Sequence, residues 1–329
     1  MEAPKVMNRE ASTDVHIDWT EFVPREIHLE DLKQSDFPRI AKDRNLMKRV
    51  WASIKQIPQK QTIVHGDSRY MDLKGIDIHL VVTSPPYWTL KKYDPSQGQL
   101  GVIENYDEFL SETDKVWQRC YDALVTGGRM VVVVGDVCLP RRKDGRHRVV
   151  PLHSSIQEHC RKIGFDNLAP IIWYKISNIN MEVEGCSRFL GKPYEPNSII
   201  KNDIEYILFL RKPGRYRSPS KAQRVLSLIS EGEQRDFYKQ IWNLPGASTK
   251  RHPAPFPLSL AERLVKMFSF VGDTVLDPFL GTGTTLFAAG LWGRSGIGYE
   301  VDRNFVRMSL ERLKGDIRFT NVDFIERLK

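Results

Sequence analysis

The sequence predicts an α/β fold, in which a Rossmann-like sheet of parallel or mostly parallel strands carries helices on both faces and one inserted region. From about residue 61, apolar runs of strand length alternate with amphipathic runs of helical length, which is typical of parallel sheets. Two of the apolar runs lead directly into tight loops, where open α/β sheets place their chemistry. With 329 residues, 41% of them hydrophobic, the chain is long enough to bury a sizeable core.

The first half of the chain divides into a polar arm, residues 1–60, and an alternating segment, residues 61–176. One helix is expected in the arm over 39–53, with apolar positions at Ile40, Leu46, Val50 and Trp51. In the alternating segment we expect helices at 106–124 and 151–163, and strands at 62–67, 76–82, 129–134 and 168–174. The arm has no function that the sequence identifies, and it either packs on the core or helps to grip a partner.

The alternation breaks over residues 177–251 and returns over residues 252–329. The breaking segment is rich in Pro, Gly, Asn and charge, and has one strand candidate at 205–210. From Lys201 to Arg251 it carries eleven Lys and Arg against five Asp and Glu. It is therefore either a region that contacts an acidic partner or a solvated loop region. The final segment is predicted to form helices at 257–268, 284–292 and 304–313 and strands at 273–276 and 296–300.

Composition narrows the class of protein. The net charge of +8 and the pI near 9.2 fit a polyanionic partner, although many soluble proteins are equally basic. The four cysteines lack CxxC spacing and no cluster of histidines lies beside them, which argues against a structural zinc site and against a disulfide framework. No apolar signal core follows Met1, and the apolar runs are too short to span a bilayer. We therefore expect a cytoplasmic protein with no membrane partner and no metal.

A glycine-rich loop, Asp277-Pro278-Phe279-Leu280-Gly281-Thr282-Gly283-Thr284-Thr285, follows one predicted strand and opens a helix. Glycines without Cβ atoms let backbone N–H groups approach a ligand, and the helix N-terminus favours an anion. The next predicted strand ends at Glu300, whose carboxylate could accept both hydroxyls of a ribose. This spacing alone also suits a dinucleotide enzyme.

A second loop, Thr83-Ser84-Pro85-Pro86-Tyr87-Trp88, ends an earlier predicted strand. Ser84 offers a hydroxyl, the two prolines make the loop rigid, and Tyr87 offers a flat aromatic face. Trp88 either extends that face or packs. The alternative interpretation is a rigid surface turn with two buried aromatic side chains.

Together the two loops resemble those of the DNA amino-methyltransferases of the N4-cytosine and N6-adenine family, a resemblance that covers roughly residues 62–312. The order, with the catalytic loop before the cofactor loop, is similar to that of the β group, found in bacterial or archaeal restriction-modification systems. The resemblance implies S-adenosylmethionine as cofactor and a sheet typical of methyltransferases that depend on it. It implies a cofactor site at Asp67, His252, Pro253, Ala254, Phe256, Asp277, Pro278, Phe279, Gly281, Gly283, Thr284, Thr285 and Glu300.

Within that resemblance the glycine loop wraps the methionine part of the cofactor, Glu300 holds the ribose and Asp67 contacts the adenine. The segment from His252 to Pro257 lines the methionine end. For Asp67 alone, a turn-forming role is the competing interpretation. The domain division that follows is an arm over 1–60, a catalytic half over 61–176, a target-recognition region over 177–251 and a cofactor half over 252–329.

The catalytic residues implied by the resemblance are Ser84, Pro85, Pro86 and Tyr87. An exocyclic base amine is a poor nucleophile, so acceptors must bind its N–H bonds and turn its lone pair toward the methyl group. Tyr87 would stack on a base rotated out of the duplex. Ser at the first position favours the N4 amine of cytosine, while the N6 amine of adenine remains the alternative. No cysteine follows a proline, which excludes ring-carbon methylation of cytosine.

The expected partner is double-stranded DNA, and a cognate restriction endonuclease acting on the same site is a second expected partner. Either a monomer or a homodimer is compatible with the sequence. Candidate duplex contacts are Lys91, Lys92, Arg141, Arg142, Arg211, Lys212, Arg215 and Arg217, each of which could equally serve solubility. Glu182, Glu184, Asn197 and Asn202 are candidate base readers. Alternatives of other classes are a catalytically silent DNA-binding module and a methyltransferase acting on RNA or a small molecule.

Overall fold

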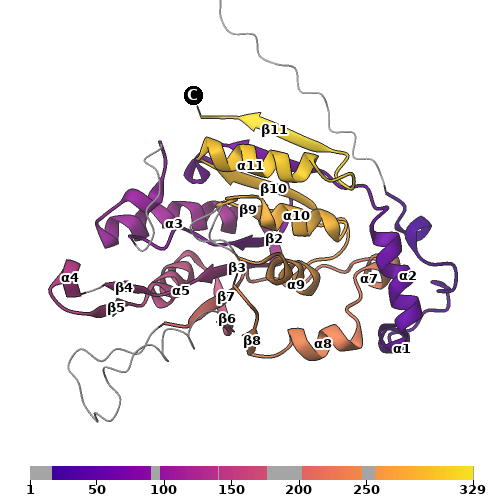
Figure 1. Cartoon of the computed structure of the whole chain (residues 1–329). Coiled ribbons are helices and arrows are strands. Elements are labelled where there is room, and N and C mark those ends of the chain that lie inside the picture. The colour runs from indigo at the N-terminus through magenta and orange to yellow at the C-terminus, as the bar shows by residue number, and fades with distance from the viewer. Residues whose placement is uncertain (1–16, 90–96, 140, 176–201, 247–255, 329) are drawn as a thin grey trace, which may run out of the picture.

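A computed structural model describes residues 17–89, 97–139, 141–175, 202–246 and 256–328. Their main feature is a nine-stranded sheet (Figure 1). Its spatial order is β11 (Val322–Glu326), β1 (Gln61–His65), β10 (Ser295–Glu300), β9 (Thr274–Asp277), β2 (Ile78–Thr83), β3 (Leu124–Val134), β7 (Ile204–Arg211), β6 (Asp166–Tyr174) and β8 (Ile241–Asn243). Every neighbouring pair from β11 to β3 is parallel, whereas β7 runs antiparallel to both β3 and β6.

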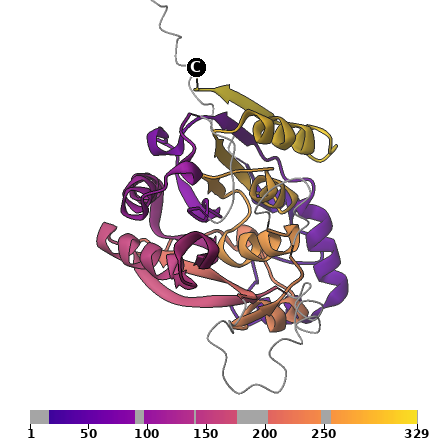
Figure 2. The ribbon, with the colours of Figure 1, turned by 60° about the vertical axis from the view of Figure 1, so that its left-hand side comes forward.

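Helices cover both faces of this sheet, which confirms the predicted architecture (Figures 1 and 2). Side chains of β3 alternate, so that Met130 and Val132 face one side and Val131 and Val133 the other. The first side packs on α3 (Tyr106–Ala123) and α5 (Leu152–Ile163). The second packs on α9 (Leu258–Phe268) and α10 (Thr284–Leu291), and α11 (Arg303–Lys314) lies beside α10 on that face. None of the helices in the described ranges is long and apolar enough to cross a membrane.

The arm packs on the core. The expected single helix over 39–53 is a pair, α1 (Asp36–Lys42) and α2 (Arg44–Ile54). The division falls at Asp43, which has extended backbone and accepts hydrogen bonds from the N–H groups of Asn45 and Leu46, so that it caps a new helix. Val50 of α2 is fully buried, in a cluster shared with α7 (Lys221–Leu226).

The predicted recognition region, 177–251, is partly built into the sheet, because β7 lies between β3 and β6. Beyond β7 it forms α7, α8 (Glu231–Phe237) and β8, which the hydrophobic pattern did not predict. Both helices begin at capping boxes, Ser220 with Gln223 and Ser230 with Glu233. The Ser-x-x-Gln and Ser-x-x-Glu spacings were the local signals for these helices. Residues 177–201 and 247–251 lie outside the described ranges.

The chain also forms small elements that were not predicted. A hairpin of β4 (Val137–Leu139) and β5 (Arg148–Val150) follows β3, with α4 (Arg141–Asp144) between its strands. The six mutually parallel strands, β11, β1, β10, β9, β2 and β3, end at one edge of the sheet, here called the carboxyl edge. The chain proceeds outward from β9 to β10 on one side and from β2 to β3 on the other. The junction of β9 and β2 is thus the topological switch point, where open α/β sheets bind ligands.

Candidate active site at the carboxyl edge of the sheet

The two loops singled out in the sequence meet at this switch point. β2 ends at Thr83 and β9 ends at Asp277, and the Thr83 hydroxyl donates a 2.7 Å hydrogen bond to Asp277 Oδ1. The Thr285 hydroxyl, at the start of α10, donates to the carbonyl of Val82 at 3.3 Å. The catalytic loop and the glycine loop, nearly two hundred residues apart in sequence, are therefore held together by buried polar contacts.

Asp277 serves this connection and is turned away from solvent. Its side chain is 1% exposed, and Oδ1 also accepts a hydrogen bond from the N–H of Phe279 at 3.0 Å. Burial raises the pKa of Asp277 to about 6, although the hydrogen bonds to its carboxylate act in the opposite direction. The sequence predicted Asp277 as part of the cofactor site. In the structure its carboxyl group lies beneath the two loops and does not line the cleft, and a role in cofactor binding stays a prediction.

A cleft opens between the two loops. Six of the predicted site residues line it: Ser84, Pro86, Pro278, Phe279, Gly281 and Glu300. The other lining residues come from the ends of β1 and β10, the loop before α3 and the start of α11, and were not predicted: Gly66, Ser68, Gly98, Gln99, Leu100, Tyr299, Val301 and Phe305. These residues share no sequence pattern of their own. Only their position next to a predicted strand or helix could have indicated that they line the cleft.

The glycine loop adopts a backbone that other residues rarely adopt. Gly281 has φ +54°, and its N–H donates a 2.7 Å hydrogen bond to Glu300 Oε2. Gly283 has φ +79°, and a Cβ there would lie 3.2 Å from the Ser309 side chain, so this glycine allows α11 to approach. The Ser309 hydroxyl in turn donates to the carbonyl of Gly281 at 2.7 Å. Helix α11 therefore fixes the loop from behind.

Glu300 ends β10 as a buried carboxylate surrounded by N–H donors. Besides Gly281, the N–H groups of Val301 and Asp302 donate to its Oε1 at 2.9 and 2.8 Å. Burial nevertheless raises the pKa of Glu300 to about 7. The carboxylate faces the cleft from the strand next to β9, as the spacing of the sequence predicted.

The remaining predicted cofactor residues are placed differently. The Asp67 carboxylate is bound by the Arg69 guanidinium and N–H, at 2.6 to 3.0 Å, and does not line the cleft, although its neighbours Gly66 and Ser68 do. Thr284 accepts a hydrogen bond from Arg312 at 2.9 Å. Phe256 is partly buried and packs against apolar clusters that contain residues of α9. His252, Pro253 and Ala254 lie outside the described residues.

The catalytic loop is anchored by its aromatic residues. Ser84 faces the cleft, and its hydroxyl donates to the Tyr87 hydroxyl at 3.2 Å. Tyr87 is only 3% exposed, so in this structure its ring does not offer the open face expected from the sequence. Trp88, at φ +46°, donates from Nε1 to the carbonyl of Glu104 at 3.1 Å and contacts Tyr106 edge to face.

The basic residues predicted after β7 lie at the opposite edge of the sheet. Because β7 is antiparallel to β3, Tyr206 pairs with Val134 at the carboxyl edge and Arg211 pairs with Arg129 at the other. The catalytic loop is at the carboxyl edge. Arg211 is the last residue of β7, and Lys212, Arg215 and Arg217 follow it, so these four residues lie away from the catalytic loop. Whether they contact a duplex stays a prediction.

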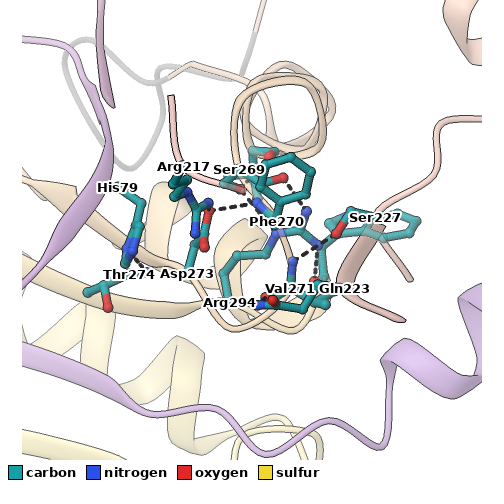
Figure 3. Close-up of polar contacts among 12 residues, drawn as sticks. His79, Arg217, Gln223, Ser227, Ser269, Phe270, Val271, Asp273, Thr274 and Arg294 are labelled. Atoms are coloured by element: carbon teal, nitrogen blue, oxygen red, sulfur yellow. Dashed lines mark hydrogen bonds and ion pairs between the residues drawn. The ribbon is translucent and has the colours of Figure 1, made fainter. Parts of the chain in front are cut away.

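Three of these four residues also have partners inside the fold. Arg211 pairs with Asp166 at 2.6 Å, and Lys212 Nζ donates to the carbonyls of Tyr121 and Leu124, both at 2.7 Å. Arg217 pairs with the buried carboxylate of Asp273, just before β9 (Figure 3).

Figure 3 shows that Arg217 belongs to a larger polar cluster that fastens α7 to the core. Gln223 Nε2 donates to the carbonyl of Val271 at 3.2 Å, and the Val271 N–H donates to the Ser227 hydroxyl at 2.9 Å. The buried guanidinium of Arg294 donates to Ser269, and burial lowers the pKa of Arg294 to about 10. This cluster is structural in character.

Two predicted duplex contacts remain on the side of the catalytic loop. Arg141 and Arg142 are exposed on α4, which follows β3 beyond the carboxyl edge and lies with β4 and β5 at the left of Figure 1. Asn202 is exposed just before β7, on the same side. Lys91, Lys92, Glu182, Glu184 and Asn197 lie outside the described residues.

Comparison with known proteins gives consistent matches. The family model described as DNA methylase, for N6 and N4 methyltransferases, matches residues 78–311. The Type II methyltransferase M.MjaI of Methanocaldococcus jannaschii is 34% identical over 307 residues, covering 82% of this chain and 98% of that protein. A candidate DNA modification methylase of Thermus thermophilus, complexed with S-adenosyl-L-methionine, has a TM-score of 0.67 and 46% identity over 83% of this chain and 100% of that chain. The DNA adenine methyltransferase YhdJ of Escherichia coli K12 is 27% identical over 271 residues, 78% of this chain and 83% of that protein.

Proposed function

The chain belongs to the N6 and N4 family of DNA methylases, and we propose that it methylates the exocyclic N4 amine of cytosine in duplex DNA. The methyl donor of the family, S-adenosylmethionine, is the donor of this protein. The observation that carries the proposal is the junction of the two loops, where Ser84 and Glu300 line one cleft. Such a cleft brings a methyl donor and an acceptor amine together, which is the main task of this chemistry.

The residues of the cleft fit this cofactor. A nucleoside with an amino-acid arm needs a hydroxyl acceptor, aromatic or apolar walls and close backbone approach. Glu300 supplies the acceptor, Phe279 and Phe305 supply walls, and Gly281 leaves room because a Cβ is absent at φ +54°. When bound, S-adenosylmethionine supplies an activated methyl group on sulfur. We assign Glu300 to the ribose and the glycine loop to the methionine arm.

Asp277 takes part indirectly in this proposal. Its hydrogen bond to Thr83 fixes the position of Ser84 relative to the glycine loop. A small displacement of either loop would misalign the amine and the methyl group, and even a small misalignment of reacting atoms strongly lowers the reaction rate. Gly283, Thr284 and Thr285 act with Asp277, since they shape the start of α10 and do not line the cleft.

Ser84 and the carbonyls before Pro85 and Pro86 are the acceptors that we assign to the target amine. Two N–H bonds held by such acceptors turn the nitrogen toward tetrahedral geometry and free its lone pair. The base must first leave the duplex stack, which costs a few kcal/mol. Tyr87 then supports the loop from beneath in the described conformation, and a stacking role requires that its ring become exposed.

Cytosine is preferred over adenine because Ser84 occupies the first position of the loop, which in the resembling enzymes goes mainly with the N4 amine. Adenine N6 methylation is the second candidate, favoured by the 27% identity to the adenine enzyme YhdJ. Duplex DNA is the substrate in both cases. Four expectations stay predictions: a cognate restriction endonuclease, a cytoplasmic location, a monomer or homodimer, and the division of the chain at residues 60, 176 and 251.

The test uses the full chain, methyl-labelled S-adenosylmethionine and mixed-sequence duplex DNA, followed by digestion to nucleosides and mass analysis. We expect the label in N4-methylcytosine. Label in N6-methyladenine would overturn the base assignment and keep the reaction class. A parallel reaction contains single-stranded RNA in place of the duplex, and label in that RNA with none in duplex DNA would contradict the proposed substrate. The Gly281→Ala variant serves as the control for label that does not depend on the cofactor cleft.

A further inference from the structure

We propose that Glu205 is a positioning residue for catalysis. It is the last member of a series of hydrogen bonds that runs from Ser84 through Tyr87, and this series carries the proton lost by the target amine to Glu205. This inference rests on the proposed function. Glu205 comes from β7, belongs to neither of the two loop motifs and does not line the cofactor cleft. It reaches the catalytic loop because antiparallel β7 brings its first residues to the carboxyl edge.

The chain of contacts is continuous. The Ser84 hydroxyl lies 3.2 Å from the Tyr87 hydroxyl, and the Tyr87 hydroxyl lies 3.0 Å from Glu205 Oε2. Ser84 also lines the cleft, so the chain begins at the wall of the cleft and ends inside the protein. Gly135, which follows β3, makes room for it. A Cβ there would lie 3.2 Å from Glu205 Cγ, close enough to shift the Glu205 side chain by a few tenths of an ångström, and 3.4 Å from Tyr87 Cε2, at van der Waals contact.

The charge on Glu205 is balanced locally. Its side chain is 12% exposed, and Lys175, just after β6, forms an ion pair with its other carboxylate oxygen, Oε1. The Lys175 ammonium also lies 4.7 Å from the centre of the Trp173 ring. A carboxylate this buried requires such a partner, because an unpaired charge in the interior is costly. Oε2 is left for the Tyr87 hydroxyl.

The donor and acceptor roles follow from the chemistry of the groups. An ionised carboxylate only accepts, so Tyr87 donates its single proton to Glu205. The carbonyl of Val133 lies 3.3 Å from the same hydroxyl, but the charge-assisted contact is shorter and stronger. The Tyr87 oxygen can then accept from Ser84, as the geometry shows. The lone pairs of Ser84 Oγ are consequently directed to the cleft, where an amine N–H would lie.

The same series of hydrogen bonds can remove the proton that the amine nitrogen must lose when it is methylated. As the bond from nitrogen to the methyl carbon forms and the bond from that carbon to sulfur breaks, the amine nitrogen gains a positive charge. One of its protons passes to Ser84 Oγ while the Ser84 proton passes to Tyr87 and the Tyr87 proton passes to Glu205 Oε2. The nitrogen is left neutral and Glu205 is left as the carboxylic acid, which returns its proton to solvent. Before transfer, the carboxylate stabilises the charge that develops on nitrogen.

The experiment compares single-turnover methyl transfer by wild type, Glu205→Gln, Tyr87→Phe and the double variant. Excess enzyme, saturating cofactor and mixed-sequence duplex DNA are used, and cofactor and duplex Kd are measured in parallel. Asp166→Asn is the matched control, since Asp166 is also an ion-paired carboxylate beside β7, at the opposite edge. Gln keeps an acceptor for Tyr87 but has no charge, and Phe keeps the ring but removes the link.

We expect Glu205→Gln and Tyr87→Phe each to lower the transfer rate about 100-fold, the scale of lost proton transfer, with both Kd values within about twofold of wild type. The double variant should be no slower than the slower single variant, because either substitution alone already interrupts the series of hydrogen bonds from Ser84 to Glu205. A wild-type rate in Glu205→Gln, losses that multiply in the double variant, or a loss that appears in Kd alone would each overturn the inference. No transfer by wild type would instead refute the proposed function.

Discussion

Replacing Asp277 with Asn tests whether this carboxyl group is buried beneath both loops. Asn is nearly the same size and keeps one oxygen to accept the hydrogen bonds from Thr83 and Phe279. What it removes is the ionisable group. Because Asp277 is 1% exposed and its folded-state pKa is about 6, the fold disfavours the ionised form, and the substitution removes that penalty.

The size of the effect follows from the two pKa values. The ordinary value is 3.8 and the folded value about 6, and each unit corresponds to about 1.4 kcal/mol, so the full penalty is about 3 kcal/mol. The folded state holds this proton more tightly than the unfolded state. Stability is therefore lost as pH rises from 3.8 through 6, and the loss is complete above that window. Between about pH 4.5 and 7.5 the change amounts to about 2 kcal/mol.

The assay is urea unfolding of wild type and Asp277→Asn across this pH range. The variant should gain about 2 kcal/mol relative to wild type between about pH 4.5 and 7.5. Glu300 is present in both proteins, so its own raised pKa cancels in the difference. Asp323→Asn, at an exposed ion pair on β11, is the matched control and should keep a constant difference from wild type. A constant difference for Asp277→Asn as well would refute the burial of this carboxyl group.

Two further predictions concern the cleft and the duplex. Gly281→Ala places a side chain at φ +54°, at a cost of about 1–2 kcal/mol. Cofactor affinity, measured by calorimetry, should fall at least about tenfold while duplex affinity is kept. Unchanged cofactor affinity would remove the glycine loop from the site. Replacing Arg141 and Arg142 with Ala should weaken duplex binding and reduce its salt slope by about two, whereas Arg215→Ala, at the opposite edge, should leave both unchanged; the reverse outcome would contradict the placement of the duplex at the carboxyl edge.

Much of the fold could be predicted because hydrophobic period and loop chemistry are local signals. The strands that end at Thr83 and Asp277, and the helices that follow, are each marked by their own residues. Glu300 could be predicted because its distance from the glycine loop is fixed by one helix and one strand. In each case, the residues that define the feature lie close to one another in the sequence.

The features that the sequence could not predict depend on distant parts of the chain. The direction of β7 cannot be deduced from its own residues, so the sequence did not indicate at which edge of the sheet the arginines after it lie. Glu205 is an isolated acid in an apolar strand, and its partner Tyr87 is 118 positions away. Likewise the hydrogen bond from Thr83 to Asp277 spans 194 positions, and only the pairing of β2 with β9 reveals it.

The most direct test of the account is a crystal structure of the full chain with S-adenosylmethionine. We expect the ligand in the cleft between the two loops, with its ribose on Glu300 and its sulfur on the side of Ser84. The hydrogen bond from the Thr83 hydroxyl to Asp277 should be retained in the complex. A ligand bound elsewhere, or one that leaves both Glu300 and the glycine loop without contact, would contradict the assignment of the site.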